Sequence, residues 1–204
     1  MNIGRNDIDW RNLSHDEIDR IIAERIEADD RRIEASGGKK PKRVGYILER
    51  IAEINNLREA DREAQDGKVK KNRFIRRHNL HPEEDLRALQ LMILTLDFPA
   101  PDYSVMKVRS DAGKVRDIVK QKYFPWRILH HAIMRVIGED IYKSLIYDTS
   151  ACIKGKGLHF GVRRMKSFLR RYPEYKWFVK TDFKKFYQSI LHELIVAALR
   201  RKFK

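Results

Sequence analysis

The sequence has 204 residues, 42% apolar and 10% aromatic, which is enough for one or two domains with a hydrophobic core and excludes a disordered chain. No apolar run approaches the ~18–20 residues of a membrane span, and no signal peptide is visible. The single cysteine, Cys152, excludes an internal disulfide and a cysteine-based zinc site, so we expect a reducing, cytoplasmic setting. Separately, we expect no membrane partner.

The formal net charge is +15, and it is segregated along the chain. Residues 1–34 carry six basic and ten acidic side chains, whereas residues 152–204 carry 15 basic and three acidic ones. A positive field of this kind attracts a polyanion, so nucleic acid is the expected partner, ahead of an anionic membrane surface. The alternative is a soluble basic protein that binds neither.

Helices are predicted through the first third of the chain. Ser14 and Glu17 form a capping-box pattern, which predicts a helix from there to about Ala35. This helix is acidic, and we expect it to dock a partner. A second helical pattern begins at Pro41 and extends to Gln65.

The middle of the chain predicts a helix and a hairpin. The basic run 68–77 is either a solvated helix face or a contact with a phosphate backbone. Residues 81–84 begin a strongly apolar helix, which Pro99 is expected to end. The alternating segments 104–109 and 115–120 predict a hairpin with a short glycine-containing loop.

The last third predicts three helices and a strand. Pro125 begins one helix, residues 159–172 form a basic amphipathic helix, and residues 191–204 form the last one. Residues 177–182 predict a buried strand that ends at Asp182. A carboxylate there needs a partner, which is either a divalent metal ion such as Mg²⁺ or an ordinary cap or ion pair with a lysine at 184 or 185.

Four segments carry a resemblance to a known family. Residues 180–190, KTDFKKFYQSI, resemble the first palm motif of reverse transcriptases, most closely the bacterial group II intron, retron and diversity-generating retroelement enzymes. Residues 147–159 are similar to the basic, glycine-containing stretch that opens a helix in this family. Residues 113–116 and 124–132 resemble its fingers segment. The resemblance covers about residues 85–204, with the motifs in the family's order.

The resemblance implies a role for each matching position. Asp182 would be the first palm carboxylate and bind two Mg²⁺ ions, with the Phe183 carbonyl as a further ligand. Tyr187 would be the bulky side chain that excludes a ribose 2′-hydroxyl, or else a core aromatic. Lys114 and Arg116 would grip the incoming dNTP, or else lie on a solvated hairpin.

Three further cations would contact nucleic acid. These are Arg127, in the fingers segment, and Lys154 and Lys156, whose neighbouring glycines permit close approach to phosphate. The alternative for the two lysines is a plain basic loop. His131 and His159 are expected to pack or cap helices, because no second histidine or cysteine stands at metal-ligand spacing.

The sequence also departs from the family. The family's site needs two more carboxylates from a Tyr-x-Asp-Asp turn, and these 204 residues contain none. The adjacent aspartates 29 and 30 lie in the N-terminal helix pattern instead, and Leu191 stands where the family has an acid. Two Mg²⁺ ions would therefore need carboxylates that are not in this chain.

The expected fold is α+β. Residues 1–80 would be an N-terminal helical extension, residues 81–175 the fingers with their hairpin and helices, and residues 176–204 the start of a palm sheet. The whole would be an incomplete right-hand polymerase.

The sequence is compatible with two functions. The first is an RNA-directed DNA polymerase that adds dNTPs to a primer on an RNA template, although not from these 204 residues alone. The alternative is a non-catalytic RNA-binding relative or a truncated fragment of such an enzyme. The family branches serve retroelement mobility, targeted diversification or antiviral defence against phage, and their partners include a noncoding RNA or an accessory protein.

Overall fold

The computed structural model describes residues 8–37, 45–68, 72–109, 113, 115–184 and 186–203. The chain divides into two compact units. The first comprises residues 1–137 and 202–204, and the second comprises residues 138–201, so the division falls within one helix. No described helix has the length and apolar character needed to span a membrane.

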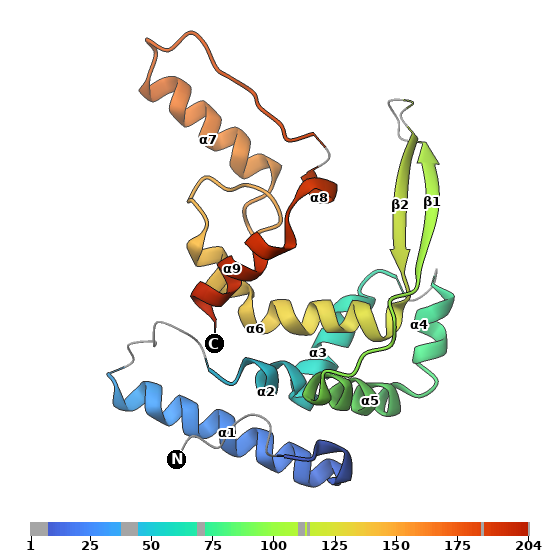
Figure 1. Ribbon diagram of the computed structural model, residues 1–204. Helices are drawn as coiled ribbons and strands as arrows, with labels where there is room; N and C mark the ends of the chain where they lie inside the picture. Colours follow the sequence, from blue (N-terminus) through green and yellow to red (C-terminus); the bar gives the residue numbers. More distant parts are fainter. Residues whose placement is uncertain are drawn as a thin grey trace. The chain divides into compact units, whose positions relative to one another are not determined.

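The first unit contains helices and one β-hairpin (Figure 1). In chain order these are the 3₁₀ turn η1 (Trp10–Asn12), α1 (His15–Ala35), α2 (Ile47–Ala52), α3 (Ile54–Gln65), α4 (Arg73–His78), α5 (Pro82–Thr95), β1 (Tyr103–Arg109), β2 (Val115–Gln121), the π-helical turn η2 (Tyr123–Arg127) and α6 (Ile128–Ser144), which continues into the second unit. The observed mixture of helices and a small antiparallel sheet confirms the α+β class at this coarse level.

Helix α1 begins as its sequence predicts. The Glu17 amide donates to the Ser14 hydroxyl at 3.3 Å, and the Ser14 amide donates to the Glu17 carboxylate at 2.8 Å. Ile18 and Ile22 on its apolar stripe are buried in the core. The capping box therefore sets the start of the helix, and burial of the stripe fixes which face packs inward.

The acids of α1 are used within the unit. Asp30 accepts from Arg50 of α2 at 2.6 Å, and Asp19 accepts from Arg87 of α5 at 2.7 Å. Arg25 of the same helix donates to the buried Glu49 at 2.7 Å. These contacts tie α1 to the unit's own helices. Whether the helix also docks a partner remains a prediction.

The helix predicted up to Gln65 is two helices, so that expectation was wrong. The backbone is extended at Glu53, with φ −56° and ψ 129°. The Asn56 side chain donates to the carbonyl of Ile51 at 3.1 Å, and the Gln90 side chain donates to that of Ala52 at 3.0 Å. These amides satisfy carbonyls at the end of α2 that no following turn satisfies.

Helix α5 begins with Pro82 at its first turn, as predicted, but ends before the prolines. Leu96 adopts a left-handed conformation at φ 56°, and its amide and that of Asp97 bond back to the last turn. The helix supplies much of the unit's core. The buried apolar residues are Trp10, Ile18, Ile22, Ile51, Ala52, Ile54, Leu57, Ala60, Ala64, Ile75, Leu86, Leu89, Ile93, Leu94, Tyr123, Ile128, Leu129 and Ala132.

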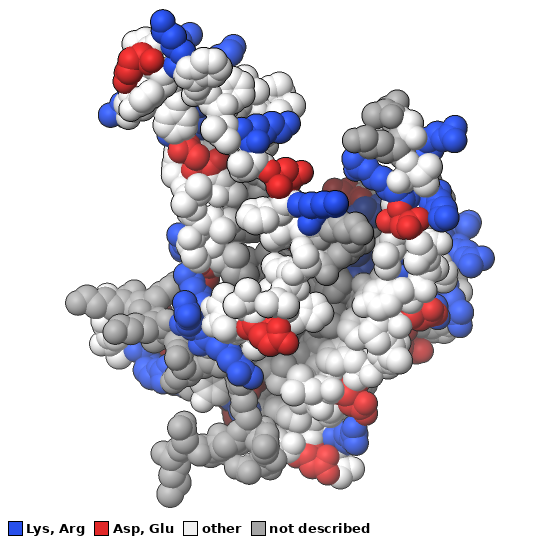
Figure 2. All heavy atoms as spheres, turned by 45° about the horizontal axis from the view of Figure 1, so that its top comes forward, with Lys and Arg blue, Asp and Glu red and all other residues white. Residues whose placement is uncertain are grey.

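The predicted hairpin is confirmed. Strands β1 and β2 pair antiparallel, from Tyr103 opposite Gln121 to Arg109 opposite Val115. Both faces are largely exposed, and Figure 1 shows the strands extending away from the helices of this unit. Figure 2 shows Lys and Arg side chains gathered over the hairpin. The predicted helix start at Pro41 and all of the predicted hairpin loop except Gly113 lie outside the described residues.

The second unit holds α7 (Leu158–Arg171), α8 (Phe186–Ser189) and all but the last residue of α9 (His192–Lys202). Helix α7 lies within one residue of its predicted bounds. Beyond Gly138, none of the described residues is buried.

The strand predicted for residues 177–182 is not formed, so that expectation was wrong. Trp177, Phe178 and Val179 are 92%, 82% and 87% exposed, and the segment is irregular. A strand needs a neighbour for its amides and a cover for its apolar side chains, and none of the described residues provides either.

Candidate functional site

Asp182 lies on the surface of the second unit. Its carboxylate makes no hydrogen bond or ion pair with any residue in the described part of the chain. The alternative of an ion pair with Lys184 is therefore not observed, and Lys185 lies outside the described residues. The position leaves the carboxylate open to a ligand.

Aromatic side chains follow Asp182. Phe183 is 80% exposed, with its ring 6.0 Å from that of Phe186. The Phe186 ring lies edge-on to Tyr187 at 5.5 Å, and Tyr187 is 91% exposed. Tyr187 is therefore not a core aromatic in this unit. Its proposed role against a ribose 2′-hydroxyl stays a prediction.

The predicted dNTP cations belong to the hairpin. Arg116 lies on β2 opposite Val108, with an exposed side chain. Lys114 lies outside the described residues. The strands carry Lys107, Arg109, Arg116 and Lys120 against the acid Asp117, so the hairpin presents an excess of positive charge.

The two lysines of the glycine-containing loop have different surroundings. Lys154 is exposed, with no described partner, and can reach a phosphate. The Lys156 ammonium instead donates to the Tyr147 carbonyl at 2.8 Å and lies 4.3 Å from the centre of the Tyr147 ring. It also lies 5.3 Å from the ring of Phe160. Lys156 therefore holds the loop against α7, and contact with nucleic acid remains a prediction for both lysines.

Sequence reasoning missed how this loop is fastened. Arg164 of α7 donates to Asp148, and this hydrogen bond lowers the pKa of Asp148 below its ordinary value. The same guanidinium lies 5.1 Å from the Tyr147 ring and 5.0 Å from that of Phe168. A signal was available: cations and aromatics alternate every four residues from Lys156 to Phe168, and within α7 this spacing places Phe160, Arg164 and Phe168 on one face.

Arg127 and His131 lie in the first unit. Arg127 lines a basic pocket beside the base of the hairpin. His131 approaches Glu63 at 3.7 Å, while burial and the charge of Arg127 lower its pKa. His131 thus acts as a packing residue, as expected. His159, in the second unit, is exposed and caps no helix end that the structure describes, so the expectation for it was wrong.

A second group that sequence reasoning missed is buried in the first unit. His78 of α4 contacts Asp85 at 2.6 Å and Asp61 at 3.2 Å, and Asp61 also accepts from the Tyr123 hydroxyl at 2.5 Å. Burial disfavours a charged ring, but the two carboxylates outweigh it and raise the pKa of His78. The group ties α3, α4, α5 and η2 together.

The predicted two-ion Mg²⁺ site does not fit the side chains of the described residues alone. No group of three or more His, Cys, Asp or Glu side chains that could hold a metal ion occurs in the described part of the chain. Asp182 and the carbonyl of Phe183 would supply only part of a coordination shell for Mg²⁺, which prefers octahedral oxygen ligands.

Comparisons with known proteins found no family model and no curated protein that matches the chain.

Proposed function

We propose that the chain is the fingers and first palm segment of an RNA-directed DNA polymerase. The ordered motifs around residues 113–132, 147–159 and 180–190 support this reading, as does the positive charge beside them. In it, Asp182 contributes the first catalytic carboxylate, and the further carboxylates come from polypeptide outside these 204 residues.

One structural observation carries the proposal furthest. The apolar segment from Trp177 to Val179, which leads to Asp182, is almost fully exposed. Contiguous exposed apolar surface is rare on a soluble protein unless something covers it. A palm supplied by further polypeptide would cover these side chains and bring its own carboxylates to Asp182.

The test is primer extension. Natively expressed material, with any polypeptide that copurifies with the chain, is supplied with an RNA template, a DNA primer, dNTPs and Mg²⁺. We expect the primer to be extended. Asp182→Ala should reduce the rate of extension by about 10²–10³-fold or more, because it removes a charged group that stabilises the transition state.

Glu174→Ala is the matched control, since Glu174 is another exposed acid of the same unit. It should leave the rate unchanged. Extension that survives in Asp182→Ala would refute the proposal, and so would equal losses in the two variants.

The second candidate is RNA binding without catalysis. It is favoured by the basic face of α7, where Arg163, Lys166, Arg170 and Arg171 border a shallow hollow of about 470 Å³. If this second candidate is correct, natively expressed material binds RNA through phosphate contacts but does not extend the primer in the assay described above.

A further inference from the structure

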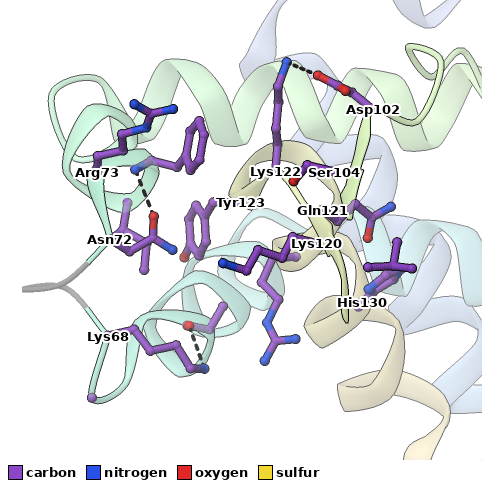
Figure 3. A pocket seen from close by; sticks show the side chains of 16 residues that line it. Lys68, Asn72, Arg73, Asp102, Ser104, Lys120, Gln121, Lys122, Tyr123 and His130 are labelled. Atoms are coloured by element: carbon purple, nitrogen blue, oxygen red, sulfur yellow. Dashed lines mark hydrogen bonds and ion pairs between the residues drawn. The ribbon is translucent and has the colours of Figure 1, made fainter. Parts of the chain in front are cut away.

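A pocket of about 1040 Å³ opens in the first unit, at the base of the hairpin. Figure 3 shows its walls: Lys68 from the turn after α3, Asn72 and Arg73 from the start of α4, Lys120 from β2, Lys122 just after it, and His130 from α6. The pocket is distinct from the segment around Asp182, which belongs to the other unit.

The lining is strongly basic. Lys68, Arg73, Lys120, Lys122 and Arg127 contribute five cations, whereas Asp102 is the one acid among the lining residues. Asp102 pairs with Lys122 at 2.6 Å (Figure 3), so it neutralises one cation and leaves four.

The remaining cations have weak partners. The Lys68 ammonium donates to the Ala64 carbonyl at 3.3 Å, and the Lys120 ammonium approaches the Met106 sulfur at 3.2 Å. An ammonium has three donors, so each lysine keeps donors for a ligand. Among the described residues, no carboxylate forms an ion pair with the Arg127 guanidinium.

The positive charge of the pocket affects the pKa of His130. Burial lowers the pKa of His130, and the nearby Arg127 lowers it further. The neutral ring thus adds no charge of its own near pH 7. The positive field comes from the lysine and arginine side chains, and an anion would relieve their mutual repulsion.

One wall offers an aromatic face. Phe74 is 40% exposed, and the Arg73 guanidinium lies 5.0 Å from the centre of its ring. Separate cations beside an exposed ring match a strand of linked nucleotides, in which phosphates alternate with flat bases. Tyr123, which also lines the pocket, is held in place because its hydroxyl donates a hydrogen bond to Asp61.

We propose that this pocket binds single-stranded nucleic acid, with Lys68, Lys120 and Arg127 on the phosphates and a base stacked on Phe74. The site does not depend on the chemistry proposed for Asp182. A free nucleotide shares the same chemistry, so the experiment separates the two.

The test measures binding of the full chain to a fluorescein-labelled oligoribonucleotide of about ten nucleotides, a length typical of single-strand sites. We expect the double variant Lys120→Ala/Arg127→Gln to weaken affinity about tenfold or more. The slope of log affinity against log salt should become shallower by about 0.7 for each lost phosphate contact. Phe74→Ala should also weaken oligonucleotide binding, while its salt slope stays unchanged.

Arg20→Gln/Arg31→Gln is the charge-matched control, because both residues lie on the exposed face of α1. It should leave affinity and slope near those of the unaltered chain. Equal losses in the pocket and control variants would overturn the proposal. Binding of a labelled nucleoside triphosphate, without binding of the oligonucleotide, would assign the pocket to nucleotides and also overturn it.

Discussion

At the scale of single residues, His78 shows how a titratable side chain becomes structural. It is 3% exposed, and its ring lies between Asp61 and Asp85 and stacks 6.2 Å from Phe124. Nothing in its sequence neighbourhood, a run of arginines, indicates two carboxylate partners, because those come from α3 and α5. Contacts of this kind cannot be predicted from local pattern.

The raised pKa of His78 predicts a pH dependence of stability. Folded protein holds a proton on His78 at pH values where the unfolded chain, with an ordinary value of 6.5, has lost it. The free energy of unfolding should therefore fall as pH rises above about 6.5, and His78→Gln should remove this fall. Urea denaturation at a series of pH values measures it.

His130→Gln serves as the control for that series. Since burial and Arg127 lower the pKa of His130, it titrates below the chosen window and should leave the slope intact. A wild-type stability that is flat or rising across the window would contradict the role given to His78.

At the scale of elements, sequence pattern predicted those whose signals are local. The capping box of Ser14 and Glu17, the proline at the start of α5 and the alternation in the hairpin each specify their element within a few residues. The break at Glu53 was missed because a distant side chain, Gln90, stabilises it. Residues 177–182 were misassigned because a strand's burial depends on neighbours outside its own sequence.

The break between α2 and α3 can be tested through Asn56. Its amide donates to the carbonyls of Ile51 and Ala132, at 3.1 and 3.3 Å. Asn56→Ala leaves both carbonyls without this donor and should cost about 1–3 kcal/mol of unfolding free energy in urea.

Asn55→Ala is the neighbouring control, because Asn55 is exposed and its amide bonds only to the side chains of Glu53, at 3.4 Å, and of the exposed Arg58, at 3.2 Å. It should change stability by no more than about 0.5 kcal/mol. Similar losses for the two variants would mean that Asn56 does not support the break.

At the scale of the whole molecule, positive charge is spread over both units. It occupies the hairpin and the pocket at its base in the first unit and one face of α7 in the second. Composition predicted an affinity for polyanions, but not the pocket, whose cations come from positions between 68 and 127 and meet only in the folded chain.

Binding of the full chain to RNA should therefore depend steeply on salt. For a single strand, each contacted phosphate contributes about −0.7 to the slope of log affinity against log salt. We expect a total slope steeper than about −2. Fluorescence anisotropy in a salt series measures it. A slope near zero would contradict the prediction that phosphate contacts dominate RNA binding.

The unequal burial of the two units decides what a melting experiment reports. All the buried apolar side chains among the described residues belong to the first unit. Heat-capacity and enthalpy changes on denaturation scale with buried surface, so a calorimetric transition would report the first unit. A substitution such as Asp182→Ala would then leave the transition temperature unmoved. An unmoved transition would therefore not show that the second unit is intact, and a probe within that unit is needed before an effect on polymerisation is interpreted as chemistry.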